Sequence, residues 1–346
     1  MTVSTALSMT QGFWTTLPKP FVVLAPLADI TDAAFRRIIA TYGKPHVFWT
    51  EFTSADRLCT SESAGVVRNL LYTEAERPIV AQLYGACPGT MEQAAARVAS
   101  LGFDGIDLNM GCPERSVVKR GAGAALSTNH TLAKAMIRAA KRGAGDLPVS
   151  VKIRLGDSQN DIESWLPVVL EEAPAVVTIH ARTRCEKSKV PAHWEVMTRA
   201  VEIRQALASP TYIIGNGDVT DVTEAWVKAA TTGVDGVMLG RAIMGNPWLF
   251  NARKSLATIT TEEKLRVMVE HTLLFEELLG DVKDLALMKK HYRAYTTDFP
   301  GAEALRLQLM HTQSAAEVAH EVATFLSPSP RRSALDHVRI QPAISG

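Results

Sequence analysis

The sequence predicts an α/β fold in which eight parallel strands, each followed by a helix, close into a (β/α)8 barrel that carries a C-terminal all-helical domain. Between residues 21 and 250, eight short apolar runs alternate with amphipathic segments, a pattern typical of parallel strands joined by crossover helices. Eight repeats favour closure into a barrel, and the 346 residues exceed the roughly 250 that such a barrel needs. After residue 250 only helical patterns follow.

The eight candidate strands are short apolar runs bounded by glycine, proline or charged residues. They span residues 21–26, 46–51, 78–85, 103–109, 148–156, 175–183, 211–218 and 235–241. The main alternative is an open, doubly wound sheet, which usually carries a glycine-rich fingerprint after its first strand. The segment LAPLADITD at the end of the first run contains no glycine. The sequence therefore favours the closed TIM barrel.

Three helical segments follow the barrel and predict a separate domain. They cover residues 261–280, 281–299 and 314–326, with breaks at Gly280 and Pro300. We therefore expect a barrel over residues 1–255, a helical domain over 260–326, and a polar, poorly ordered tail over 327–346.

Composition restricts the location and the partners of the protein. No run of about 18 apolar residues predicts a membrane span, and residues 1–11 lack the basic start and long apolar run of a signal peptide. We expect a cytoplasmic protein with no membrane contact and no obligate protein partner. The net charge of +1 gives no support for a nucleic-acid partner, although a local basic patch would suffice.

The four cysteines show no pattern of a metal site. Cys59, Cys87, Cys112 and Cys185 form no C-x-x-C pair and have no metal-ligand spacing with the histidines. We therefore expect no metal and no disulfide framework. Cys59 and Cys87 are interpreted as buried, inert side chains, and Cys185 has no predicted role.

Alternation within the candidate strands turns polar side chains into the barrel. Successive strand residues face opposite sides, so in residues 148–156 the apolar side chains should face the helices and Lys152 and Arg154 the interior. The same parity turns inward Gln82, Asp107, Asn109, Thr178, His180, Arg182 and Asn216. Most of them lie near the C-terminal strand ends, where barrel enzymes place their active sites. The cluster predicts a polar ligand, and a set of separately satisfied buried groups is the alternative.

Glycine-containing turns follow the last two candidate strands. Asn216, Gly217 and Asp218 follow the seventh strand, and Gly240 and Arg241 follow the eighth, which are the usual positions of a phosphate site in a barrel. A phosphate site beside Lys152 indicates FMN, because a reduced flavin is negatively charged along one edge and a fixed ammonium stabilises it. An internal salt bridge between Lys152 and Asp107 is the alternative.

Cys112 differs from the other cysteines in its position. It lies in a Gly-Cys-Pro turn just beyond the fourth candidate strand, and Arg115, Lys119 and Arg120 follow it. A thiol in such a place can act as a nucleophile, a ligand or an acid. Position alone does not choose among these roles.

Several motifs resemble one known family, the tRNA-dihydrouridine synthases. The resemblance covers about residues 21 to 250, and the helical remainder is similar to the C-terminal domain of that family. N-x-G-C-P after the fourth strand is the most specific motif. The matching segments, in order, are LAPLADITDAAFRR, VAQLYG, IDLNMGCP, VKIRLG, IHARTR, IGNGD and GVMLGRAIMGNPWLF.

The resemblance implies tightly bound FMN, NADPH as the reductant and tRNA as the substrate. In this family reduced FMN transfers a hydride to C6 of a tRNA uridine, and the cysteine that matches Cys112 protonates C5. Asn109 would hydrogen-bond the uracil, and further substrate contacts would come from Arg115, Arg154 and Arg182. The flavin would be held by Pro26, Leu27, Ala28, Gln82, Lys152, His180, Asn216, Gly217, Asp218, Gly240 and Arg241.

Two positions depart from the family pattern. Leu27 replaces a usual methionine, and Arg115, preceded by Glu114, replaces a usual lysine. RNA contacts are expected from local basic clusters, for each of which a solvated surface is the alternative. The clusters are Arg115, Lys119 and Arg120; Arg182, Arg184, Lys187 and Lys189; and Lys289, Lys290 and Arg293.

Two other functions are compatible with a flavin-binding barrel. The first is an FMN-dependent oxidoreductase of a free small metabolite, for which the helical domain would not be required. The second is a tRNA-binding protein that has lost catalysis, against which the presence of Gln82, Cys112, Lys152 and His180 speaks.

Overall fold

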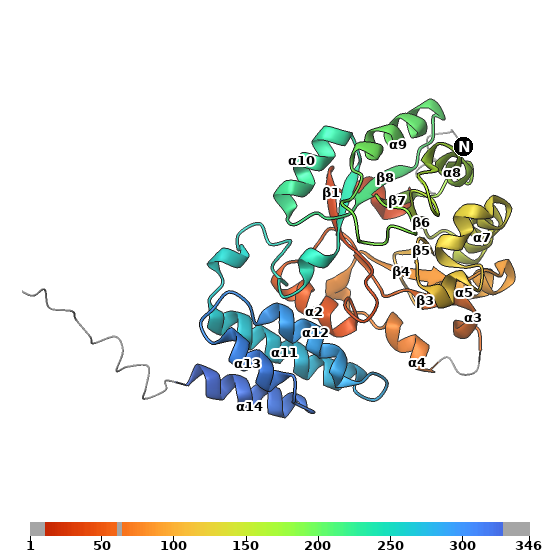
Figure 1. Cartoon of the computed structure of the whole chain (residues 1–346). Coiled ribbons are helices and arrows are strands. Elements are labelled where there is room, and N and C mark those ends of the chain that lie inside the picture. The colour runs from red at the N-terminus through yellow and green to blue at the C-terminus, as the bar shows by residue number, and fades with distance from the viewer. Residues whose placement is uncertain (1–10, 61–63, 328–346) are drawn as a thin grey trace, which may run out of the picture.

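The computed structural model describes residues 11–60 and 64–327 and contains the predicted barrel (Figure 1). Its strands are all parallel and follow the order β1-β9-β8-β7-β6-β5-β4-β2. The bounds are β1 Phe21–Leu24, β2 Phe48–Trp49, β3 Thr53–Ser54, β4 Ile79–Tyr84, β5 Gly105–Met110, β6 Val149–Arg154, β7 Val176–His180, β8 Tyr212–Asn216 and β9 Gly236–Leu239. Each of the eight predicted strands is present, and the fold class is confirmed.

The barrel closes between its first two strands. A single parallel bridge joins Val23 to Val47, and the amide of Leu24 donates to the carbonyl of Val47 at 3.2 Å. The short strand β3 was not predicted. It pairs with the end of β4 and continues the wall that β2 begins.

Helices form the outer layer of the barrel, as expected from the amphipathic segments. Several begin at a side chain that accepts a backbone N–H, such as Asp32 at α2 and Asn129 at α7. The bounds are α2 Ala33–Tyr42, α3 Ala55–Leu58, α4 Ala64–Val67, α5 Pro88–Ser100, α6 Arg115–Val118, α7 His130–Ala144, α8 Ile162–Leu170, α9 Glu195–Ala206 and α10 Val222–Thr232. Short 3₁₀ turns are η1 Gly12–Thr16, η2 Arg68–Leu70, η3 Glu74–Glu76, η4 Gly123–Thr128, η5 Arg241–Ile243, η6 Leu256–Thr258 and η7 Leu285–Met288.

The N-terminal half of the barrel interior is filled by apolar side chains. Trp14 of η1 closes this end, with its ring 5.4 Å from that of Phe21 and 5.7 Å from that of Trp49. Deeper in the barrel, Ile214 and Met238 belong to the same buried cluster. Most polar side chains of the interior therefore lie toward the C-terminal strand ends, whereas Asp107 and Ser150 are buried within the barrel.

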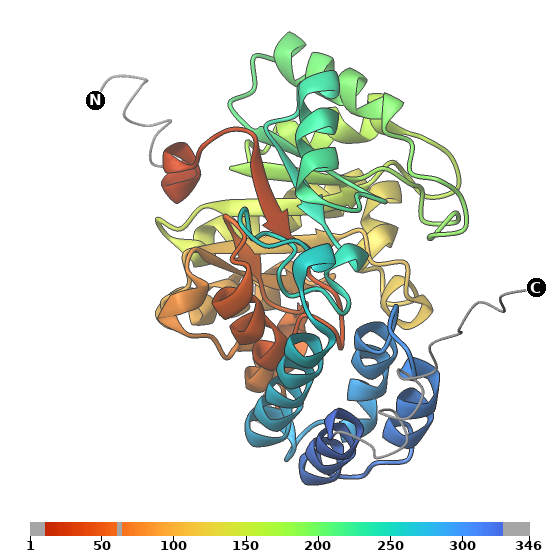
Figure 2. The same cartoon turned by 90° about the vertical axis from the view of Figure 1, so that its left-hand side faces the viewer.

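Four helices after the barrel gather on one side of it, next to α2 (Figures 1 and 2). They are α11 Thr261–Leu279, α12 Lys289–Tyr295, α13 Ala302–Leu309 and α14 Ala315–Leu326. Phe35 of α2 stacks on His271 of α11, with ring centroids 4.6 Å apart. In the described part of the chain, no helix is both long and apolar enough to cross a bilayer.

The helical region differs from the prediction in two details. The helix expected over residues 281–299 begins only at η7 and ends at Tyr295, and α13 was not expected. Asp284 explains the late start, because its side chain accepts the amide of Ala286 and caps the new turn. The predicted tail lies outside the described residues except for Ser327.

Lys283, between α11 and η7, connects the helical region to the barrel by ion pairs. Its ammonium lies 2.8 Å from Oε2 of Glu51 and 3.4 Å from Oδ1 of Asp29. The side chain of Glu51 is 4% exposed and that of Lys283 13%. Glu51 also accepts the amide of Asp29 at 2.6 Å. One lysine thus holds two loops of the barrel.

We predict that Lys283→Met lowers the free energy of unfolding by about 3 kcal/mol, because it leaves the buried Glu51 carboxylate without its cation. Asp281→Asn is the matched control, since it removes an exposed pair with Arg68 and should cost less than about 1 kcal/mol. Urea denaturation of both variants measures the difference. Equal destabilisation by the two changes would contradict the prediction.

Candidate functional site

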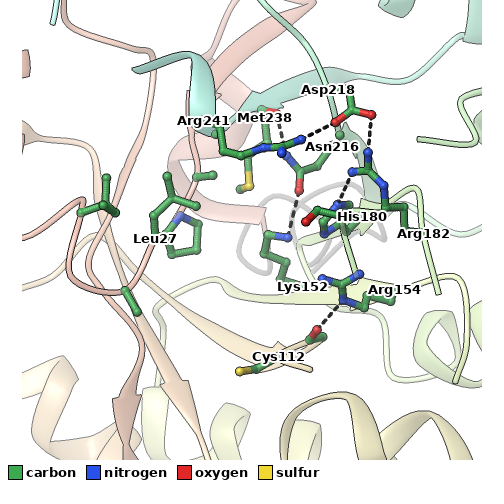
Figure 3. Close-up of a pocket in the computed structure, with 18 of the residues that line it drawn as sticks. Leu27, Cys112, Lys152, Arg154, His180, Arg182, Asn216, Asp218, Met238 and Arg241 are labelled. Carbon is green, nitrogen blue, oxygen red and sulfur yellow. Dashed lines mark hydrogen bonds and ion pairs between the residues drawn. The ribbon is translucent and has the colours of Figure 1, made fainter. Parts of the chain in front are cut away.

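The polar ends of the strands surround one cavity at the C-terminal end of the barrel, with a volume of about 1050 Å³. Figure 3 shows Lys152 between Leu27 on one wall and His180 on the other. Most of the predicted site residues line the cavity: Pro26, Leu27, Ala28, Asn109, Cys112, Lys152, Arg154, His180, Arg182, Asn216, Gly217, Asp218, Gly240 and Arg241.

Lys152 on β6 presents an ammonium group to this cavity. Its Nζ donates to Oδ1 of Asn216 at 3.1 Å, and Asn216 is itself fixed because its Nδ2 donates to the carbonyl of Met238 at 2.8 Å. Among the described residues no ion pair joins Lys152 to Asp107, so the alternative salt bridge is absent. Burial, together with the nearby Arg154 guanidinium, lowers the pKa of Lys152 to about 8.

The turns after β8 and β9 are connected through Asp218. Its carboxylate accepts from Arg182, from Nη2 of Arg241 at 2.5 Å and from the amide of Ala192 at 2.9 Å. The hydrogen bond from Arg182 is the main reason that the pKa of Asp218 is lowered. Because its partners include two guanidinium groups, Asp218 orients two arginines at the cavity.

Gly217 is required by this turn, whereas Gly240 is not. Gly217 has φ +139°, and a Cβ at this position would lie 2.7 Å from the Cβ of Ala192. A Cβ on Gly240 would make only ordinary contacts, the nearest at 3.6 Å. The carbonyl of Gly217 also accepts from Nε1 of Trp194 at 2.7 Å, which holds the turn against the β7–α9 loop.

His180 is held as a neutral imidazole. Its Nε2 lies 3.2 Å from Nη1 of Arg182. Because a guanidinium can only donate, this ring nitrogen accepts and carries no proton. Burial, with the charge of Lys152 next in importance, lowers the pKa of His180 well below its usual value. The imidazole therefore offers a proton only from Nδ1.

Cys112 lies in a turn that three neighbours fix. The Oδ1 atom of Asn109 accepts from the amides of Gly111 at 3.1 Å and Cys112 at 2.8 Å. Nε of Arg154 donates to the carbonyl of Gly111 at 2.7 Å. The carbonyl of Cys112 accepts the amide of Ala124 at 3.0 Å. The thiol is 9% exposed, and burial raises its pKa.

Two predicted site residues do not line the cavity. Gln82 is fully buried, and its side chain contacts Asp107 and Asn109 instead. Arg115 begins α6 and is exposed outside the cavity. Among the other lining residues, Phe52, Ser188 and Met238 were not predicted. The inward parity of Met238 in β9 could have identified it, but no sequence signal marks Phe52 or Ser188.

The expectation that Cys59 and Cys87 are buried is wrong, because both are exposed, as is Cys185. Cys87 precedes α5, and its pKa is lowered by hydrogen bonds from the backbone and side chain of Thr90. Of the predicted RNA-contacting residues, Arg182 is 2% exposed and Arg184 is paired with Asp157. The spacing of charges in a sequence does not reveal such internal partners.

A closed parallel barrel with a basic cavity at the C-terminal strand ends defines a barrel enzyme. Residues 23–328 match the family model described as dihydrouridine synthase. A "Probable tRNA-dihydrouridine synthase" of Staphylococcus aureus strain COL is 40% identical over 312 residues, which cover 89% of this chain and 94% of the relative. "Probable tRNA-dihydrouridine synthase 2" of Bacillus subtilis strain 168 is 40% identical over 313 residues, which cover 90% and 95%.

The chain belongs to the dihydrouridine synthase family, flavin-dependent oxidoreductases that act on uridine in tRNA. This membership decides against the two other functions considered from the sequence. A solved amine oxidase of Pseudomonas geniculata, which acts on 6-hydroxypseudooxynicotine, shares the fold alone, with a TM-score of 0.51 and 15% identity. That match covers 75% of this chain and 53% of the other.

We predict that iodoacetamide modifies Cys87 well before Cys112 at near-neutral pH. The thiolate is the reactive form, and the pKa of Cys112 is raised by burial whereas that of the exposed Cys87 is lowered by hydrogen bonds. Peptide mass spectrometry over a time course gives both rates. Modification of Cys112 first would contradict a protonated, buried thiol.

Proposed function

We propose that the cavity holds FMN, that NADPH is the reductant, and that the Cys112 thiol donates a proton to C5 of the target uracil. The observation that carries this proposal is the pairing of two groups in one cavity: a buried thiol of raised pKa and an ammonium aimed at the same space. The buried thiol suits a general acid, and the ammonium suits the anionic ring of a reduced flavin.

The lining has the chemistry that FMN requires. Lys152 has a single hydrogen-bond partner among the described residues, the neutral Asn216, so its charge is available to a ligand. Arg241 has a side chain that is 65% exposed and would take the phosphate beside Gly217. Pro26, Leu27 and Ala28 offer a largely apolar part of the lining, and Leu27 lies across the cavity from His180 (Figure 3). When bound, a reduced flavin supplies a hydride.

The chain's own contribution to the reaction is the proton. Reduction of the uracil C5–C6 double bond requires a hydride at C6 and a proton at C5, and Sγ of Cys112 supplies the proton as its S–H bond breaks. The thiolate left behind is stabilised by the charges of Arg154 and Lys152 and regains a proton from solvent. Asn109, which is 8% exposed and lines the cavity, would hold the uracil.

We further propose that residues 1–255 form the catalytic domain and residues 260–326 the domain that contacts tRNA. The uridine must leave its stack to reach the cavity. Four basic side chains are exposed and form no ion pair with another described residue: those of Lys119, Arg120, Lys290 and Arg293. Their charge is available to phosphates. Arg115, Lys187 and Lys189 are exposed in the same way.

We predict that Cys112→Ala retains bound FMN but reduces unmodified tRNA at least about 100-fold more slowly, since general acids typically contribute 10²- to 10⁴-fold. Cys185→Ala, which removes an exposed thiol on the β7–α9 loop, should leave the rate unchanged. Dihydrouridine formed with NADPH is measured by mass spectrometry of digested tRNA. A Cys112→Ala enzyme with full activity would remove the acid role.

We predict that FMN affinity falls as the pH rises through about 8, the pKa of Lys152 in the free protein. The ammonium is present below this pH and attracts the anionic ligand; above it the amine is neutral and the attraction is lost. Lys152→Met should bind FMN more weakly and without this pH dependence. Lys264→Met, a change at a buried lysine in α11, should retain it. Quenching of FMN fluorescence reports the affinity.

A further inference from the structure

A fully buried carboxylate lies beneath the cavity and has no place in the reaction described above. Asp107 of β5 is 0% exposed and is paired in register with Gln82 of β4 on one side and Ser150 of β6 on the other. Oδ1 of Asp107 accepts from Oγ of Ser150 at 2.6 Å, and Oδ2 accepts from Nε2 of Gln82 at 2.6 Å. Burial of a carboxylate is costly unless hydrogen bonds or charges compensate for the lost hydration.

Hydrogen bonds continue from Asp107 to the turn that holds Cys112. Oε1 of Gln82 accepts from Nδ2 of Asn109 at 3.0 Å. Oδ1 of Asn109 then accepts from the amide of Cys112 at 2.8 Å and from that of Gly111 at 3.1 Å. Two side-chain amides thus connect a carboxylate in the barrel core to the backbone of the thiol-bearing residue.

The two ends of this chain impose one direction on it. An ionised carboxylate only accepts, so Gln82 must turn its NH₂ group toward Asp107 and its oxygen toward Asn109. Asn109 must then turn its NH₂ group toward Gln82, which leaves its oxygen for the two backbone N–H groups. Those groups only donate. Both ends therefore select the same orientation of both amides, and a flipped amide at either position would leave buried groups unsatisfied.

We propose that Asp107 is a positioning residue that acts through Gln82 to lock the Asn109 amide, and thereby sets both the Cys112 turn and the remaining Nδ2 hydrogen of Asn109 for a carbonyl oxygen of the pyrimidine. This inference rests on the proposed roles of Cys112 and Asn109. It also gives Gln82 a function that needs no place in the cavity lining.

The inference is tested in the oxidative half-reaction of the flavin-loaded enzyme. The flavin is first reduced without oxygen and then mixed with unmodified tRNA, and its absorbance is followed. Asp107→Leu removes the acceptor and should slow reoxidation at least about tenfold, because a small misplacement of reacting groups costs up to about 10²-fold. Asp107→Asn should stay within about threefold of the wild type, since its oxygen still accepts from Gln82 and its NH₂ can donate to Ser150.

Ser150→Ala is the matched control. It removes the other hydrogen bond of the same carboxylate without touching the chain toward Asn109, and its reoxidation rate should be that of the wild type. The absorbance spectrum of bound flavin and the thermal midpoint of each variant report folding. If Asp107→Leu does not fold, Gln82→Leu takes its place, because it breaks the same chain and should also slow reoxidation at least about tenfold. A Gln82→Leu enzyme with the wild-type rate, or an Asp107→Asn enzyme slowed tenfold, would overturn the inference.

A double-mutant cycle tests the route through Gln82. Gln82→Leu breaks the chain one step later, so adding Asp107→Leu to it should slow reoxidation no further. Independent, multiplicative effects would overturn the inference, as would an Asp107→Leu enzyme that reoxidises at the wild-type rate while Cys112→Ala is slow. Failure of the proposed acid role is recognised separately, by a Cys112→Ala enzyme that keeps the full rate.

Discussion

The charge of Lys152 at the mouth of the barrel is the constraint on which the rest of the site depends. Burial opposes the charged form and lowers the pKa of Lys152 to about 8, and the only hydrogen bond that compensates among the described residues comes from a neutral amide. This charge affects the protonation of neighbouring side chains. His180 remains neutral partly because Lys152 is near, and Lys152 favours the charged form of the buried Asp107. The cavity is thus positively charged, which favours an anionic ligand.

The same positive charges favour loss of the proton from Cys112, which would weaken the proposed acid. Burial of the thiol offsets this effect. Burial and the Glu114 carboxylate favour the thiol at Cys112, whereas a hydrogen bond from the backbone of Glu114 and the charges of Arg154 and Lys152 favour the thiolate, and the balance raises the pKa of Cys112. Arg154 is held in place by hydrogen bonds to the carbonyls of Gly111 and Thr183, and its charge remains close to the thiol. Its guanidinium thereby fixes the turn while the thiol stays protonated, and the nearby charge stabilises the thiolate that remains after proton transfer.

The sequence predicted the fold because eight strand-like runs alternate with helical segments. The direction of Lys152, Asn109 and Asn216 follows from strand parity. Parity likewise predicted the other strand residues of the lining, whereas the loop residues were predicted from the glycine-containing turns and from the family resemblance. It could not predict that Gln82 is covered, because parity distinguishes inside from outside but gives no depth within the barrel. The sequence placed Asp218 in the cavity lining but could not predict its ion pairs with Arg182 and Arg241. Such pairings join residues of different loops, and no local pattern encodes them.

The helical region contacts the β1–α2 loop, which also forms part of the cavity wall. The loop between β1 and α2 supplies Pro26, Leu27 and Ala28 to the cavity wall, and its next residue, Asp29, contacts Lys283 of the helical region. Asp32 at the end of this loop is buried, and burial together with Glu51 raises its pKa to about 7. Lys283 opposes that shift. The helical region thus provides a cation that stabilises three acidic side chains around one loop, those of Asp29, Asp32 and Glu51. Loss of this cation would therefore disturb the cavity wall as well as the contact between the two parts of the chain.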